Sequence, residues 1–155
     1  SKAEVRAWPW IGALAAGVGT LFIQRESRKD ALRVVHHMDQ SLRNGDVLAI
    51  FPEGTTGDGV SLLPFHANLL QAAISSNAPV QPVAIDYLDG GSGQRSAAPC
   101  YVGDESLLES VWRSLKAQSI TVKISFGQIQ SADGRDRRAW AADLRSQIEQ
   151  MREQP

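Results

Sequence analysis

The chain has 155 residues, a formal net charge of −1, 43% hydrophobic residues and 21% charged residues. This length supports one hydrophobic core, so we predict a single domain over residues 1–155. The near-zero net charge is not typical of a polybasic or polyacidic chain, and we expect no nucleic-acid partner. The single cysteine, Cys100, excludes an internal disulfide scaffold, and with no histidine beside it in the sequence we expect no metal site. A chain without disulfides fits a reducing compartment.

The N-terminal segment 7–24 is uncharged and approaches the roughly 20 residues that cross a bilayer as a helix. Its pattern favours a helix followed by a short strand at residues 20–23, because Pro9 suits a first helical turn and glycines then interrupt the apolar run. Trp8 and Trp10 leave a role at a membrane–water boundary open.

Helices and strands alternate along the rest of the chain. The apolar run VLAIF, residues 47–51, is typical of a strand covered on both faces. Pro82 cannot donate to a strand ladder, so we expect it at a strand start, an edge or a bulge. The predicted helices cover residues 27–43, 66–76, 107–117 and 136–152, and the further predicted strands cover 80–87 and 120–129. This order predicts an α/β fold with a largely parallel or mixed sheet flanked by helices.

The FPEGTT stretch, residues 51–56, follows a predicted strand, where parallel α/β folds bind their ligands. Gly54 can adopt a positive φ and let backbone N–H groups approach a ligand, and Thr55 and Thr56 add hydroxyl groups. A tight turn in which Glu53 caps backbone amides explains the composition equally well. The GTTGDG spacing does not match either of the nucleotide-binding glycine loops.

The stretch GTLFIQR, residues 19–25, brings Arg25 to the end of the first predicted strand. If the strands are parallel, Arg25 and Glu53 lie at the same edge of the sheet. A guanidinium suits an anionic headgroup such as a phosphate or a carboxylate. A solvated charge at a helix entrance is the alternative interpretation of Arg25.

Three stretches, GTLFIQR, FPEGTT and APVQPVAI, resemble in order and spacing the second, third and fourth motifs of the glycerolipid acyltransferases. This is the 1-acylglycerol-3-phosphate acyltransferase group, and the resemblance extends to its lyso-ornithine lipid branch. It covers roughly residues 5–87. It implies a glycerolipid acyltransferase-like fold, of which this chain is the C-terminal portion.

The resemblance also implies an activity. An acyl group passes from acyl-CoA or acyl-carrier protein to the hydroxyl of a lysophospholipid, 1-acylglycerol-3-phosphate, or of a lyso-ornithine lipid. The resemblance implies a membrane-associated enzyme of phospholipid biosynthesis at the cytoplasmic face of the inner membrane, with the membrane surface as a partner. No cofactor is expected beyond the acyl donor as co-substrate.

The resemblance implies that the acceptor's headgroup and glycerol-like portion bind Arg25 and the turn. Glu53 then holds the turn or contacts the acceptor hydroxyl. The implied substrate-binding residues are Arg25, Phe51, Pro52, Glu53, Gly54, Thr55 and Thr56. The implied acyl-chain residues, which an ordinary core strand would also explain, are Val80, Pro82 and Val83.

The chain departs from the family pattern in its histidines. The family's first motif is His-x-x-x-x-Asp, in which the histidine is the general base and the aspartate orients it. None of His36, His37 and His66 is followed five positions later by an aspartate, and Asp39 does not complete the pattern. No catalytic residue is therefore identified within the chain. We expect the dyad upstream of Ser1 and the 155-residue chain to be inactive without it.

Further departures concern substrate binding. Thr56 stands where many members carry Arg, which removes a cation from the phosphate site and makes a zwitterionic lyso-lipid a candidate acceptor. His66 and Asn68 stand where Lys and Gly are frequent. A non-catalytic module that binds lipid headgroups is the alternative function, because it explains the missing dyad directly.

Overall fold

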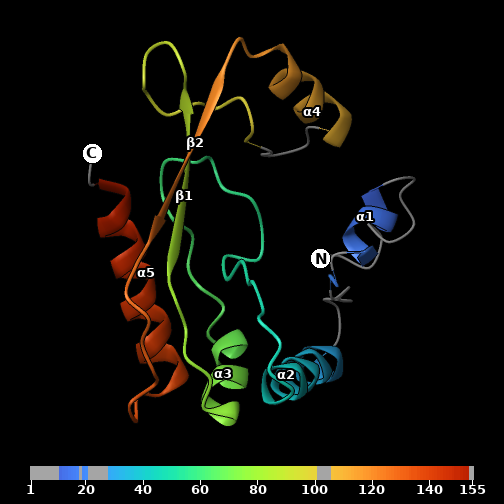
Figure 1. Cartoon of the computed structure of the whole chain (residues 1–155), viewed down its shortest axis with the longest axis vertical. Coiled ribbons are helices and arrows are strands. Elements are labelled where there is room, and N and C mark those ends of the chain that lie inside the picture. Colours follow the sequence, from blue (N-terminus) through green and yellow to red (C-terminus); the bar gives the residue numbers. More distant parts are fainter. Residues whose placement is uncertain (1–10, 18, 21–27, 101–105, 154–155) are drawn as a thin grey trace. The chain divides into compact units, whose positions relative to one another are not determined.

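The computed structural model describes residues 11–17, 19–20, 28–100 and 106–153 (Figure 1). The chain divides into two compact units, residues 1–48 and residues 49–155, and each unit is described by itself. The single domain predicted from the sequence stays a prediction.

The first unit contains helices α1, Ile11–Gly17, and α2, Arg28–Arg43. Helix α1 agrees with the helix predicted near Pro9, whereas Pro9 itself and residues 21–23 of the predicted strand lie outside the described residues. Helix α2 follows the prediction closely and ends before Gly45, whose φ of 88° is left-handed. Within the described part of the chain, every helix is too short or too polar to cross a membrane.

The strand predicted at residues 47–51 is wrong. These residues have no strand pairing in the structure, and Val47 and Phe51 are 97% and 76% exposed. A central strand forms only where neighbouring strands accept and donate its backbone hydrogen bonds, and the local apolar run does not supply those partners. An apolar sequence without such neighbours therefore stays irregular.

Among its described residues, the second unit contains a 3₁₀ turn, three α-helices and a two-stranded sheet (Figure 1). A 3₁₀ turn at Ala67–Leu69 leads into α3, Leu70–Ser76, and the other elements are β1, Val83–Asp89, α4, Leu107–Lys116, β2, Ile120–Phe126, and α5, Arg137–Glu153. Their order agrees with the predicted α/β class. Pro82 immediately precedes β1, as expected for a residue without an N–H group.

Strands β1 and β2 are antiparallel, with Val83 opposite Phe126 and Asp89 opposite Ile120. The sequence predicted a largely parallel or mixed sheet within an α/β fold; the strand pair among the described residues is antiparallel, and the α/β class is confirmed. The end of β1 at Asp89 lies opposite the start of β2 at Ile120, so the connection that contains the ten-residue helix α4 joins neighbouring ends of the two strands. Chain direction is therefore reversed in β2.

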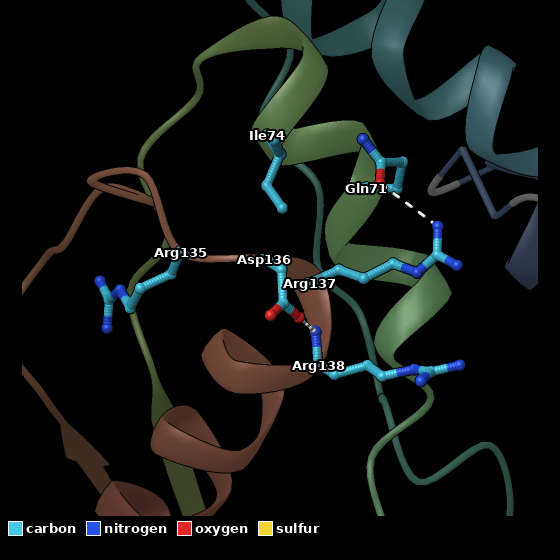
Figure 2. Close-up of a pocket in the computed structure, with 6 residues that line it drawn as sticks. All are labelled: Gln71, Ile74, Arg135, Asp136, Arg137 and Arg138. Atoms are coloured by element: carbon cyan, nitrogen blue, oxygen red, sulfur yellow. Dashed lines mark hydrogen bonds between the residues drawn. The ribbon is translucent and has the colours of Figure 1, made fainter.

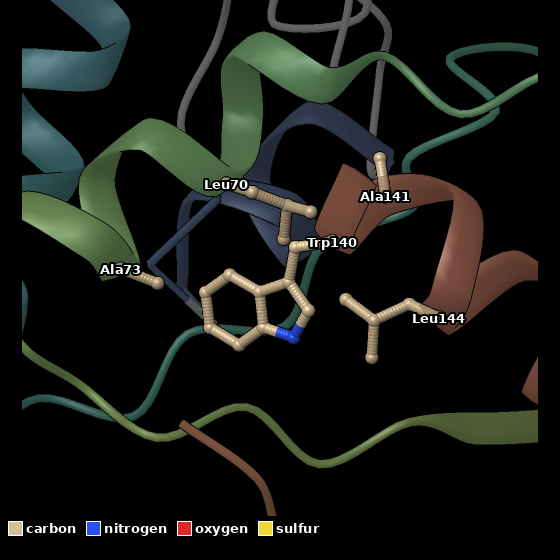
Figure 3. Close-up of a cluster of buried hydrophobic side chains, with 5 residues drawn as sticks. All are labelled: Leu70, Ala73, Trp140, Ala141 and Leu144. Atoms are coloured by element: carbon tan, nitrogen blue, oxygen red, sulfur yellow. The ribbon is translucent and has the colours of Figure 1, made fainter. Parts of the chain in front are cut away.

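The core of the second unit forms around Trp140, which is fully buried (Figure 3). Its indole packs among residues from α3 and α5: Leu70, Ala73, Ala141 and Leu144. The indole N–H donates to Gln130 Oε1 at 3.0 Å, so the one polar atom of this side chain is satisfied inside the core. Helix α5 thus fixes both α3 and the segment after β2.

Helix α5 also packs along β1, whose inner face carries a charge. Ala84 and Asp86 are buried on this face, and Arg152 Nε donates to Asp86 Oδ1 at 2.9 Å. The side chains of Arg152 and Asp86 are 9% and 6% exposed. A buried carboxylate without a partner would be strongly destabilising, so this ion pair fixes the position of α5 on the sheet.

We expect Trp140→Ala to lower the free energy of unfolding by about 3–5 kcal/mol, because it removes a buried aromatic side chain and leaves a cavity. Trp112→Ala is the matched control, since Trp112 is 60% exposed and its loss should change stability by less than about 1 kcal/mol. Urea unfolding followed by far-UV circular dichroism measures both values. Equal losses for the two variants would contradict the assignment of the core.

Asp136 caps the start of α5, where its Oδ1 accepts the N–H groups of Arg138 and Ala139 at 2.7 and 3.1 Å. Both donors lower the pKa of Asp136 below its ordinary value, and the N–H of Ala139 has the larger effect. The carboxylate's contribution to stability is therefore fully present above about pH 4, and it is lost as the pH falls through the lowered pKa.

Asp136→Asn keeps a capping oxygen but cannot titrate. The difference in Tm between the wild type and this variant should accordingly shrink as the pH falls from 5 to about 2. Asp136→Ala, which has no cap, should melt below the wild type at neutral pH. Melting curves at a series of pH values check this, and a pH-independent gap between the wild type and Asp136→Asn would refute it.

Candidate functional site

The FPEGTT segment forms a tight turn in the second unit. The N–H of Gly54 donates to the carbonyl of Phe51 at 3.1 Å, and Gly54 has a φ of 71°. The positive φ expected from the sequence at this glycine is therefore confirmed, and other residues adopt it only with strain. Thr55 and Thr56 follow with exposed side chains.

Glu53 holds this turn against the chain that follows it. Its Oε2 accepts the N–H of Leu63 at 2.7 Å, and the N–H of His66 donates to the carbonyl of Pro52 at 2.8 Å. Among the described residues, Glu53 Oε1 accepts no hydrogen bond. The structure thus supports the turn-holding role of Glu53, while contact with an acceptor hydroxyl stays a prediction.

His66 lies directly against the turn. A Cβ atom added at Gly54 would come within 2.7 Å of His66 Cδ2 and 2.8 Å of Nε2, so the imidazole occupies the space that any side chain there would need. The sequence indicated only that His66 has no aspartate five positions later, as a general base of the family would have, and that it stands where lysine is frequent. No spacing rule could have placed it beside Gly54, because the two residues belong to no common helix or strand.

Guanidinium groups of α5 hold the loop between the turn and His66. Arg145 Nη2 donates to the carbonyl of Leu62 at 2.6 Å and its Nε to the carbonyl of Leu63 at 3.3 Å. Arg152 donates to the carbonyls of Gly59 and Val60. Sequence reasoning missed both arginines, although each flanks the apolar stripe of a predicted helix.

Asp58 closes a small turn in the same loop. Its Oδ1 accepts the N–H groups of Val60 at 2.9 Å and Ser61 at 3.2 Å. Both donors lower the pKa of Asp58 below its ordinary value, and the N–H of Val60 has the larger effect. Asp58 is therefore a structural residue of this loop.

The residues of the fourth motif lie at the entry to β1. Val80 exchanges backbone hydrogen bonds with Gln130 at 2.9 and 3.0 Å, and the carbonyl of Pro82 accepts the N–H of Gly127 at 2.9 Å. Val83 is the first residue of β1. This placement agrees with the structural interpretation of the three residues, and contact with an acyl chain stays a prediction.

Arg25 lies outside the described residues, so its predicted approach to Glu53 stays a prediction. The histidines of α2 lie within them and make ordinary helix contacts. His36 Nε2 is 3.1 Å from Gln40 Nε2, and Asp39 pairs with Arg43 at 3.0 Å. Asp39 is thus engaged by a neighbouring arginine on its own helix.

Cys100 is unpaired, as the sequence predicted, and its Sγ lies 3.3 Å from the carbonyl oxygen of Asp58. In the described part of the chain, no cluster of three or more His, Cys, Asp or Glu side chains could hold a metal ion.

A shallow pocket opens where the start of α5 meets α3 (Figure 2). Its polar groups connect these elements: Arg137 Nη1 donates to Gln71 Oε1 at 3.4 Å, and Asp136 caps α5. Arg135 donates to Asp143 at 3.1 Å. The predicted substrate-binding residues that the structure describes, at positions 51–56, do not line this pocket, in which Arg137 and Gln71 connect α5 with α3.

Comparison with known proteins bears on the same turn. The family model described as Acyltransferase matches residues 1–86, which include the FPEGTT turn. The chain is 36% identical over 151 residues to the 1-acyl-sn-glycerol-3-phosphate acyltransferase of Neisseria gonorrhoeae, with 97% of this chain and 57% of the relative covered. It is 41% identical over 150 residues to the lyso-ornithine lipid O-acyltransferase of Pseudomonas aeruginosa, with 97% and 55% covered. The chain therefore spans little more than half the length of these relatives.

Among solved structures, the crystal structure of the 1-acyl-sn-glycerophosphate acyltransferase PlsC from Thermotoga maritima is similar, with a TM-score of 0.60 at 18% identity. This similarity covers 100% of this chain and 56% of that chain, and it supports the α/β fold. The match of the family model over more than half of the chain agrees with the resemblance seen in the three motifs. The chain belongs to the acyltransferase family.

Proposed function

We propose that this chain is part of an enzyme that transfers an acyl group from acyl-CoA or acyl-carrier protein to the hydroxyl of a lyso-lipid in membrane lipid biosynthesis. The acceptor is a lysophospholipid, 1-acylglycerol-3-phosphate, or a lyso-ornithine lipid, and the enzyme works at the cytoplasmic face of the inner membrane. The observation that carries this proposal is the turn at Glu53 and Gly54, which is held by the hydrogen bond from Leu63 to Glu53 and leaves Thr55 and Thr56 exposed.

The turn supplies the acceptor site in this proposal. Thr55 and Thr56 donate hydrogen bonds to the polar headgroup, and Gly54 lets backbone N–H groups approach it. Glu53 keeps the turn in place through Leu63, and its second oxygen is available to the acceptor hydroxyl. Arg25 contributes the positive charge that an anionic group requires.

The identity of residue 56 bears on the choice of acceptor. A threonine hydroxyl can donate to a phosphate oxygen but brings no positive charge, so a zwitterionic headgroup becomes as suitable as a phosphate. Relatives named for either acceptor match the chain over nearly its whole length. We therefore propose both acceptors as substrates to be compared in the same assay.

The general base in this proposal is a histidine upstream of Ser1, paired with an aspartate five positions later. Attack by an alcohol on a thioester needs a base near neutral pH to accept the hydroxyl proton. The acyl carbonyl carbon then bonds to the alcohol oxygen, and the thiol of the donor leaves. The 155-residue chain alone is proposed to be inactive, because its described histidines pair with no aspartate.

A second candidate function is a module that binds lipid headgroups without catalysis, and the absence of the dyad from this chain favours it. The sequence that encodes the residues before Ser1 distinguishes the two candidates. A His-x-x-x-x-Asp motif there, together with acyl transfer by the longer protein, supports the enzyme. Binding of lyso-lipid by the longer protein without any acyl transfer supports the module.

The proposed role of Glu53 is tested in the longer protein with two substitutions. Glu53→Gln keeps an oxygen that can accept the N–H of Leu63, whereas Glu53→Ala leaves that donor without its partner. We expect Glu53→Ala to reduce kcat/KM at least about tenfold, the effect of losing about 1.4 kcal/mol. Glu53→Gln should stay within about threefold of the wild type if the turn is its main role.

Radiolabelled acyl transfer to 1-acylglycerol-3-phosphate and to lyso-ornithine lipid measures these rates. Glu153→Ala is the matched control, because this exposed glutamate lies at the end of α5 and should leave the rate unchanged. Wild-type activity in Glu53→Ala would show that the turn is not part of the acceptor site. A loss in Glu53→Gln as large as that in Glu53→Ala would instead assign Glu53 to contact with the acceptor hydroxyl.

A further inference from the structure

Helix α4 is oriented with its small polar residues toward the protein. Ser110 is 5% exposed, and Ser114 Oγ donates to the carbonyl of Ala98 at 3.0 Å. Arg113 Nε donates to the same carbonyl at 3.0 Å. The contacts that hold α4 on its own unit are therefore hydrogen bonds to the loop before it, made by serine and arginine side chains.

The apolar residues of α4 face away from those contacts. They recur at helical spacing, three and four residues apart, and form one continuous surface that we call the α4 stripe: Leu108, Val111, Trp112 and Leu115. Leu108 and Leu115 are 80% and 72% exposed, and Trp112 is 60% exposed. This is the reverse of an ordinary surface helix, which turns its apolar stripe toward the core.

The α4 stripe is not needed to form the helix. Ser106 and Glu109 make a capping box, in which Ser106 Oγ accepts the N–H of Glu109 at 3.3 Å and Glu109 Oε2 accepts the N–H of Ser106 at 2.8 Å. The start of α4 is thus fixed by its own side chains. An apolar surface that contributes to neither the core nor the cap indicates contact with something outside the unit.

The charges beside the stripe indicate the nature of that contact. Lys116 Nζ lies 5.2 Å from the centre of the Trp112 ring in the last turn of α4, whereas Arg113 donates to the carbonyls of Ala98 and Cys100 on the protein side. The acidic residue of the helix, Glu109, is used in the cap. Apolar residues with a tryptophan, bordered by a lysine, are typical of helices that lie in the surface of an anionic bilayer.

We propose that α4 is a membrane-contacting helix, which inserts Leu108, Val111, Trp112 and Leu115 into the acyl-chain boundary of an anionic bilayer while Lys116 faces the phosphates.

This inference goes beyond the proposed function and draws one reason from it, since a lyso-lipid acceptor lies in a bilayer. The membrane contact itself needs no catalysis. It also needs no residue of the FPEGTT turn. Binding to vesicles and acyl transfer can therefore fail independently of each other.

The test places an environment-sensitive NBD fluorophore at the stripe of the longer protein, through Leu108→Cys in a chain whose other cysteines, Cys100 included, are replaced by serine. Vesicles of phosphatidylglycerol and phosphatidylethanolamine are the probe, with phosphatidylcholine vesicles for comparison. We expect the fluorescence to shift to the blue and to rise at least about twofold on anionic vesicles, with a weaker response at high salt. Ser146→Cys, on the exposed surface of α5, is the matched control and should respond little.

A variant that combines Leu108→Ser, Trp112→Ser and Leu115→Ser should lose at least about tenfold in binding to the same vesicles, measured by co-sedimentation. Far-UV circular dichroism verifies that this variant is folded. An unchanged affinity in the folded variant would overturn the proposal. So would an NBD label at residue 108 that is already shielded before vesicles are added, or that responds to protein concentration instead of lipid.

A soluble assay separates this proposal from the enzymatic one. Acyl transfer to a short-chain, water-soluble lyso-lipid without vesicles should be equal in the wild type and the triple variant, because the stripe contacts no residue of the turn. Vesicle insertion of a wild type that transfers no acyl group would support the role of α4 and reject the proposed enzyme. Acyl transfer by a wild type whose label does not respond to vesicles would support the proposed enzyme and reject the role of α4.

Discussion

The buried ion pair of Asp86 and Arg152 is the interaction on which the second unit depends. Asp86 lies on the inner face of β1, where an isolated carboxylate would be costly, and Arg152 reaches it from the last turn of α5. The same guanidinium also donates to the carbonyls of Gly59 and Val60. One side chain therefore connects a strand, a helix and the loop that follows the candidate site.

The candidate site is held in place by contacts with α5, the helix that carries Arg152. The peptide groups of Leu63 are held on both sides, because the N–H donates to Glu53 and the carbonyl accepts from Arg145 of α5. Helix α5 is itself fixed by the Trp140 core. A turn with a left-handed glycine is thereby held by hydrogen bonds from distant residues, as a preorganised binding site requires.

Helix α4 uses the opposite arrangement within the same unit. Helix α5 buries Trp140 in the core, whereas α4 leaves Trp112 and its apolar neighbours exposed and contacts the protein through Ser114 and Arg113. Both helices are amphipathic, and amphipathicity alone does not state which medium covers the apolar side. In the proposed enzyme, one helix would build the acceptor site and the other would hold it at the membrane.

The sequence by itself determined the helices and the α/β class, because helical periodicity, capping residues and glycine stops act within a few neighbouring residues. It also determined the turn at Gly54, whose φ follows from local geometry, and it carried the motifs of the acyltransferase family. It predicted residues 47–51 wrongly as a strand, because a strand depends on partners far along the chain. Only the tertiary structure decided that Asp86 is buried against Arg152, that His66 covers the turn, and which side of each amphipathic helix faces the protein. These contacts join residues that share no helix, strand or sequence period, and therefore no local pattern encodes them.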